Sequence, residues 1–110
     1  GDHPIYPDCR PEFNDPMNLA IFEGTGGEVV LQTPFQDLRK ETIARLGWDR
    51  ALRIQGNPKV MAATWSCYQP VRLDGGVSAP IHCGRCGTCV ERKEAFEGAG
   101  IEDPTVYETK

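Results

Sequence analysis

One stretch of the sequence decides how this chain folds: Cys83-Gly84-Arg85-Cys86-Gly87-Thr88-Cys89. Two residues separate each cysteine from the next, and the glycines permit the tight turns that point successive side chains toward one centre. A fourth cysteine, Cys67, precedes the stretch across a 15-residue loop. Four thiolates favour tetrahedral zinc, and a closed shell of four ligands leaves no position for water. The pattern therefore predicts a structural zinc site with four ligands, Cys67, Cys83, Cys86 and Cys89.

Other interpretations of the cysteines stay open at this point. An iron-sulfur cluster could use the same thiolates, although the bacterial ferredoxin run has a further Cys followed by Pro that this chain lacks. Disulfides need an oxidising compartment, and the total of five cysteines is odd. His82 could replace one cysteine as a ligand, or it lies in an exposed loop. Cys9, outside the cluster, is expected to be a buried or half-buried thiol beside a helix start.

The length and composition favour a single globular domain at most. The chain has 110 residues, 39% of them hydrophobic, and a net charge of −4, so its surface as a whole is no general binder of nucleic acid. It contains no apolar run of the roughly 20 residues that a membrane span needs and no signal-like segment. We therefore expect a cytoplasmic protein that binds neither membrane nor nucleic acid directly. Because the sequence begins at Gly1 without an initiator Met, we also expect a trimmed or cut piece of a longer protein.

The remaining sequence predicts a mainly helical chain with one short strand. Residues 28–32 contain three apolar residues in a row and indicate a strand buried on both faces, which normally belongs to a parallel sheet. Pro16 predicts either a second helix start capped by Asp15 or a kink in the first helix. The expected helices run from Pro11 to residue 23, from Leu38 to Leu46 with an end at Gly47, over 48–55, and over 90–98 after the cysteines.

Six blocks of sequence, in order along the chain, are similar to the QueC family, the 7-cyano-7-deazaguanine synthases of queuosine and related 7-deazapurine biosynthesis. The blocks are Tyr6-Pro7-Asp8-Cys9-Arg10-Pro11-Glu12-Phe13, Thr33-Pro34-Phe35, Lys40 with Ile43-Ala44-Arg45-Leu46-Gly47, Thr64-Trp65-Ser66-Cys67-Tyr68, His82 to Cys89, and Asp103-Pro104-Thr105. The chain departs from the family at Asn14-Asp15-Pro16, and the segments 48–63 and 69–81 look longer or different.

The resemblance implies an α/β fold, the C-terminal portion of an adenine-nucleotide-hydrolase-like (Rossmann-like) domain with one or two short parallel strands and a four-cysteine zinc site. It also implies an ATP-dependent ligase that uses Mg²⁺ and converts 7-carboxy-7-deazaguanine and ammonia to the nitrile, through an adenylated carboxylate and an amide. The family's Ser-Gly-Gly-x-Asp-Ser loop, on which its ATP site rests, does not occur in these 110 residues. This chain alone is therefore expected to be inactive without an N-terminal ATP-binding half.

The resemblance also suggests roles for individual residues. It makes the four clustered cysteines the zinc ligands, and it places Asp8, Arg10 and Lys40 at substrate-binding positions, while no catalytic residue is assigned. We expect one C-terminal portion of a synthetase domain, with substrate-side helices and strand in 1–66 and the zinc-binding region and last helix in 67–110. A homodimer is compatible with the family.

Two other functions stay open. The chain could be a standalone zinc-stabilised module that serves in binding or assembly without catalysis, or a related ligase that acts on a different carboxylate. Asp8, Arg10 and Lys40 at matching positions favour the synthase, because a pure zinc module would not require them.

Overall fold

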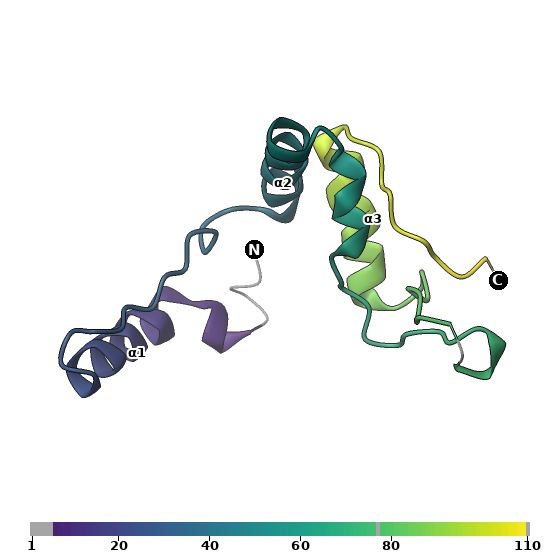
Figure 1. Ribbon diagram of the computed structural model, residues 1–110. Coiled ribbons are helices and arrows are strands. Elements are labelled where there is room, and N and C mark those ends of the chain that lie inside the picture. Colours follow the sequence, from purple (N-terminus) through teal and green to yellow (C-terminus); the bar gives the residue numbers. More distant parts are fainter. Residues whose placement is uncertain (1–5, 77, 110) are drawn as a thin grey trace. The chain divides into compact units, whose positions relative to one another are not determined.

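The computed structural model of the chain describes residues 6–76 and 78–109. It divides between Arg39 and Lys40 into two compact units, each of which is described by itself below. The α-helices are α1 (Pro11–Gly24), α2 (Lys40–Gln55) and α3 (Gly87–Ala99), with short 3-10 turns η1 (Pro7–Cys9), η2 (Pro58–Ala63) and η3 (Asp74–Gly76) (Figure 1). None of the helices in the described ranges combines the length and the apolar character that crossing a membrane would require.

Helix α1 forms the centre of the first unit and runs without interruption through Pro16. Pro11 stands at the first helical position, where its missing N–H costs nothing, and the N–H groups of Phe13 and Asn14 donate to Arg10 O at 3.0 Å. Of the two predictions for Pro16, the second helix start is wrong, because α1 continues across it. The helix ends where expected, with Thr25 Oγ1 donating to Ile21 O at 2.8 Å.

The segment 28–32 is not a strand, so the strand prediction is wrong in this structure. Its N–H groups find side chains instead of a neighbouring strand: Val29 N donates to Thr25 Oγ1 at 3.1 Å and Leu31 N donates to Asn18 Oδ1 at 2.7 Å. A short apolar run becomes a strand only where another strand supplies hydrogen bonds. Asn18 of α1 and Thr25, the residue that caps its end, thus accept hydrogen bonds that a neighbouring strand would otherwise take.

Helix α2 is one helix of 16 residues, where the sequence predicted two that meet at Gly47. Gly47 does not end the helix. It lies inside α2, where the absence of a side chain leaves space for Met61. A Cβ added at Gly47 would lie 2.7 Å from Cε of Met61 in η2. The buried residues of α2 are Ala44 and Ala51, which lie on the same face of the helix as Gly47. The helix therefore packs closely through small side chains.

The second unit has a small apolar core between α2, η2 and α3 (Figure 1). Ala44 of α2 packs with Ala95 and Phe96 of α3, and Met61 of η2 lies against them. Helix α3 begins three residues earlier than expected and ends at Gly100, whose φ of 69° gives the left-handed cap. Its buried face contains Cys89, Arg92, Ala95 and Phe96. The apolar core and the cysteine cluster are thus two separate groups of buried residues on the same face of α3.

The mainly helical character predicted from the sequence is confirmed, but the described residues contain no strand. Two isolated bridges are present instead: an antiparallel one between Val71 and Ile81, and a parallel one between His82 and Tyr107. The parallel bridge brings the C-terminal segment back along α3 (Figure 1). The one or two short parallel strands of the expected α/β fold are thus absent from this part of the structure, since neither bridge extends beyond one residue pair.

Candidate metal centre

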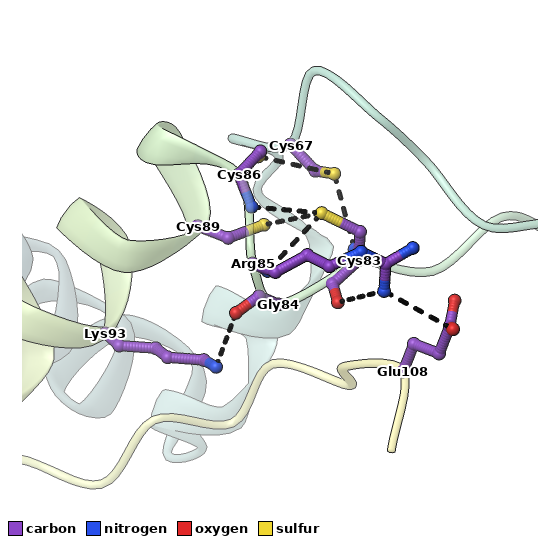
Figure 2. Close-up of polar contacts among 8 residues, drawn as sticks. All are labelled: Cys67, Cys83, Gly84, Arg85, Cys86, Cys89, Lys93 and Glu108. Atoms are coloured by element: carbon purple, nitrogen blue, oxygen red, sulfur yellow. Dashed lines mark hydrogen bonds and ion pairs between the residues drawn. The ribbon is translucent and has the colours of Figure 1, made fainter. Parts of the chain in front are cut away.

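The four cysteines singled out in the sequence converge in the second unit (Figure 2). Their sulfur atoms all lie within 4.8 Å of one another. Cys67 comes from the segment after η2, Cys83 and Cys86 from the glycine-rich turn, and Cys89 from the first turn of α3. Cys67, Cys83 and Cys89 are buried, and Cys86 is half-buried. The four thiols form one enclosed donor set of a single chemical type.

The spacing of the sulfurs fits a single tetrahedral ion. Cys83 Sγ and Cys89 Sγ are 4.0 Å apart, and Cys86 Sγ and Cys67 Sγ are 3.9 Å apart. Four sulfurs at 2.3 Å from a central zinc would be separated by about 3.8 Å, the edge of the corresponding tetrahedron. Four sulfurs this close suit one ion better than a cluster of several iron and sulfide atoms.

Backbone N–H groups around the cluster point at sulfur (Figure 2). Arg85 N and Cys86 N donate to Cys83 Sγ at 3.4 and 3.3 Å. Cys67 Sγ accepts from Gln69 N at 3.2 Å and from Cys83 N at 3.3 Å. Donors aimed at sulfur stabilise a thiolate, and such outer-shell contacts orient the ligands of a metal. The backbone N–H groups of this turn are therefore placed to stabilise the thiolate form of the cysteines.

The hydrogen bonds and the burial shift the thiol pKa values in different directions. The Thr88 hydroxyl, 3.2 Å from Cys86 Sγ, is the largest cause that lowers the pKa of Cys86 to about 5. The backbone N–H of Arg85 is the largest cause that lowers the pKa of Cys83. Burial raises the pKa of the fully buried Cys89 to about 12. Placing a cation at the centre would remove the obstacle to ionising Cys89.

His82 is buried and lies beside the cluster without belonging to it. Its Nε2 accepts from Ser66 N at 3.2 Å, and its ring lies against the Trp65 ring with centroids 4.2 Å apart. Burial, followed by the charge of Arg92, lowers the pKa of this imidazole. The prediction that His82 lies in an exposed loop is wrong, because the residue is buried and its ring holds the segment before Cys67. The described group that could hold an ion consists of the four cysteines without His82.

The C-terminal segment closes over the glycine-rich turn. Lys93 Nζ donates to Gly84 O at 2.8 Å (Figure 2). The same Nζ lies 4.6 Å from the centroid of the Tyr107 ring. Arg85 forms an ion pair with Glu108 at 3.4 Å. A Cβ at Gly84, whose φ is +78°, would lie 3.3 Å from both Lys93 Nζ and Tyr107 Cβ. Gly84 is thus required both by its backbone conformation and by the close approach of its neighbours.

The structure places the three expected substrate residues in two different units. Asp8 belongs to η1 and Arg10 follows it, and both side chains are exposed in the first unit. Cys9, between them, is half-buried, and its Sγ is 4.0 Å from Asp8 Oδ1. Lys40 begins α2 in the second unit and forms an ion pair with Glu91 of α3. Lys40 therefore already joins the two helices of its own unit.

One residue of the site was missed by sequence reasoning. Arg92 is 92% buried, with 8% of its surface exposed, and it contacts the segment that carries Cys67. The spacing contains the signal, because Cys89, Arg92 and Phe96 fall at i, i+3 and i+7 and so share one helix face. A charged residue on the buried face of a helix indicates a specific set of partners.

The state of the thiols and the type of donor bear on the interpretations of the cluster. All five cysteines of the chain are free, so no disulfide is present. The described residues that could hold an ion as a group are the four cysteines, and their donors are all sulfur. Sulfur donors in a tetrahedral arrangement suit zinc, and the metal centre predicted from the sequence fits this donor set.

Comparison with known proteins agrees with the resemblance seen in the sequence. Residues 1–100 match the family described as "Queuosine biosynthesis protein QueC". A 7-cyano-7-deazaguanine synthase of Porphyromonas gingivalis is 49% identical over 108 residues, which cover 98% of this chain and 42% of the relative. The synthase of Caldicellulosiruptor bescii is 44% identical, with the same coverage of 98% and 42%. That of Rhizobium etli is 47% identical over 100% of this chain and 41% of the relative.

The chain spans about two fifths of the length of these curated relatives. No solved structure matches it at a significant level. The match with the family extends over all but the last ten residues and includes the whole cysteine cluster. The chain belongs to the QueC family of queuosine biosynthesis proteins.

Proposed function

We propose that this chain supplies the metal-stabilised part of a 7-cyano-7-deazaguanine synthase, an ATP-dependent ligase that converts 7-carboxy-7-deazaguanine and ammonia to the nitrile. The observation that supports this most strongly is the family match over residues 1–100, together with four sulfur atoms within 4.8 Å of one another. The relatives named for this activity are more than twice as long as the chain. The chain is proposed to act as one part of such an enzyme.

The metal proposed for the cluster is zinc, held by Cys67, Cys83, Cys86 and Cys89. With four thiolate ligands the ion has no open position, so it supplies structure and takes no part in activating water or substrate. The turn after His82, the start of α3 and the C-terminal segment meet at the cysteine cluster, so a zinc ion there would connect these three segments (Figure 2). The zinc is thus proposed to hold the second unit together.

Asp8, Arg10 and Lys40 are proposed to bind the substrate. A carboxylate such as Asp8 accepts hydrogen bonds from the N–H groups of a deazaguanine base. The guanidinium of Arg10 offsets the negative charge of a carboxylate or a phosphate with paired N–H donors. Lys40, at the start of α2, would contribute charge, and to do so it must share its ammonium with Glu91 of α3. The exposure of Asp8 and Arg10 is consistent with residues that meet a ligand.

The longer protein is proposed to supply the other requirements of the reaction. ATP, bound with Mg²⁺ on a loop of an N-terminal half, provides the leaving group that makes the carboxylate reactive toward ammonia. Such a half would also supply the sheet of the α/β domain expected from the family. We further propose a cytoplasmic location, in keeping with five free thiols, and a homodimer as the assembled state.

Reconstitution tests this function. The chain, a matched N-terminal portion of the Porphyromonas gingivalis synthase, and the two together are incubated with ATP, Mg²⁺, ammonia and 7-carboxy-7-deazaguanine, and the nitrile is measured by mass spectrometry. We expect nitrile only from the mixture. Arg10→Ala in the chain should abolish it, whereas Arg53→Ala, at an exposed position near the end of α2, should not.

The same experiment separates the alternatives. Nitrile from the 110 residues alone would contradict the proposed division of labour. Absence of nitrile from a mixture in which the chain binds zinc and associates with the N-terminal portion would favour a binding module without catalysis. Turnover of ATP with a different carboxylate in place of the deazaguanine would favour a related ligase.

A further inference from the structure

The four cysteines differ in how they reach the site. Cys83, Cys86 and Cys89 lie within seven consecutive residues, so a single turn and the start of α3 hold them. Cys67 lies 16 residues before Cys83 and must be brought in from a separate segment. Bringing Cys67 to the other three cysteines costs conformational entropy. Metal binding must offset this cost unless the fold of the metal-free protein already holds Cys67 in place. Whatever holds Cys67 in place therefore affects how tightly the site binds metal.

Arg92 attaches the segment that carries Cys67 to α3. One Nη of Arg92 donates to Ser66 Oγ at 3.1 Å, directly before Cys67. The other Nη donates to Thr64 Oγ1 at 2.8 Å and to Met61 O at 3.2 Å. Arg92 itself stands one helical turn after Cys89, on the same buried face of α3. A single side chain thus connects the distant ligand with the helix that carries the last ligand.

The remaining contacts of Arg92 fix its own position. Its Nε donates to Thr105 Oγ1 at 2.7 Å, and its guanidinium carbon lies 5.3 Å from the centroid of the Phe96 ring. The acceptors described for its N–H groups are uncharged oxygens. Burying a guanidinium among neutral acceptors contributes little to stability, but its rigid fork fixes the positions of the groups that it contacts. These contacts suit a residue that fixes the positions of its neighbours.

We propose that Arg92 is a positioning residue for the metal centre, which holds Cys67 in the geometry for ligation before the ion arrives. The proposal rests on the metal site proposed above and adds a residue that is not itself a ligand. Loss of Arg92 leaves three local thiols in place and removes one of the attachments of the Cys67 segment, which then keeps its contacts with His82 and Cys83, so that the fourth thiol is held less firmly. The expected consequence is weaker metal binding with one thiolate fewer, by about 10- to 100-fold, the range found when outer-shell partners of metal ligands are removed.

Titration of the full chain with Co²⁺, followed by displacement with Zn²⁺, tests the proposal. Thiolate-to-cobalt charge-transfer absorption counts the sulfur ligands, and displacement gives the zinc affinity. Arg92→Met retains the apolar stem against Phe96 and removes the donors. We expect it to bind zinc about 10- to 100-fold more weakly and to lose charge-transfer intensity. Arg50→Met, at an exposed position of α2, should match the unsubstituted chain.

A second pair of variants separates positioning from general stabilisation. Ser66→Ala and Thr105→Val each remove one hydroxyl acceptor from the same guanidinium, but only Ser66 adjoins Cys67. We expect Ser66→Ala to weaken zinc binding and Thr105→Val to leave it near the starting value. Because neither variant removes the buried charge, this pair decides the matter even where Arg92→Met fails to fold.

The proposal is overturned when Arg92→Met binds zinc as tightly as Arg50→Met with full charge-transfer intensity, or when Ser66→Ala and Thr105→Val weaken binding equally. A failure of the metal site itself looks different. In that case the unsubstituted chain shows no four-thiolate cobalt spectrum.

Discussion

Replacing Cys89 by serine is the most direct perturbation of the second unit. The side chain has no exposed surface, and its sulfur is one of the four that converge. Serine keeps the size and the side-chain hydrogen-bonding capacity but binds zinc poorly at this position, because its hydroxyl stays protonated. The first effect of Cys89→Ser is therefore the loss of one ligand, and the second is a hydroxyl buried among sulfur and carbon atoms.

The magnitude follows from these two effects. Structural zinc contributes about 10–16 kcal/mol in small domains, so an equal share for each of four ligands is about 2.5–4 kcal/mol. A buried hydroxyl without a good partner costs about 1–3 kcal/mol. We therefore expect Cys89→Ser to lower the free energy of unfolding of the zinc-bound protein by about 5 kcal/mol, which corresponds to a fall in Tm of about 20 °C for a chain of this size.

Cys9→Ser is the matched control, because Cys9 is half-buried and lies outside the cluster. It should change the free energy of unfolding by no more than about 0.5 kcal/mol, as surface substitutions usually do. Thermal and urea unfolding are followed by circular dichroism under reducing conditions, with zinc and again with a chelator. In chelator, the difference between Cys89→Ser and the unsubstituted chain should shrink to the hydroxyl contribution alone.

The reasoning is refuted by either of two results. Equal losses in free energy of unfolding for Cys89→Ser and Cys9→Ser would mean that the cysteine cluster contributes no more to stability than a thiol outside it. If Cys89→Ser lowers the free energy of unfolding by the same amount after zinc removal, the contribution of Cys89 to stability does not come from metal binding.

Three further measurements address other parts of the structure. At pH 7, zinc binding should release a proton from Cys89, whose pKa burial raises to about 12, and none from Cys86, whose pKa the Thr88 hydroxyl lowers to about 5, so affinity should rise with pH. Calorimetry in buffers of different ionisation enthalpy checks this, and four protons released per zinc would contradict it. Phe96→Ala should cost about 3–5 kcal/mol in urea unfolding, whereas Phe22→Ala, 42% exposed in α1, should cost far less. Gly100→Ala should cost about 1–2 kcal/mol, since the left-handed cap at φ 69° disfavours a Cβ, and a neutral result would show that α3 ends without needing that conformation.

The cysteine cluster and most helix limits could be predicted from the sequence because their causes are local. Two-residue spacing and glycine turns are enough to make Cys83, Cys86 and Cys89 converge, and Gly100 ends α3 by its own conformational freedom. Cys67 was included by its chemistry, although its position depends on contacts that no local pattern contains. The α/β character of the fold stays a prediction, because the residues that the structure describes contain two single bridges in place of strands.

Where prediction failed, the cause was a distant partner. Gly47 looks like a helix end, but it lies inside α2 because Met61 needs the space that a side chain would fill. Residues 28–32 look like a strand, but the Asn18 side chain of α1, 13 residues before Leu31, accepts the hydrogen bond of Leu31 N. Arg92 looks like a surface residue of a helix rich in charge, and its burial depends on oxygens from three other segments.

The closeness of the sulfur atoms has a second chemical consequence. Cys86 Sγ and Cys67 Sγ are 3.9 Å apart, and a disulfide needs only about 2 Å between them, a shift that two side chains can make by small rotations. Cys86, whose pKa is lowered to about 5, is suited as a thiolate to attack an oxidant. A bound cation that occupies all four sulfurs therefore also protects them. Once the ion is removed in air, oxidation of two of these thiols to a disulfide would prevent the metal from binding again until the disulfide is reduced.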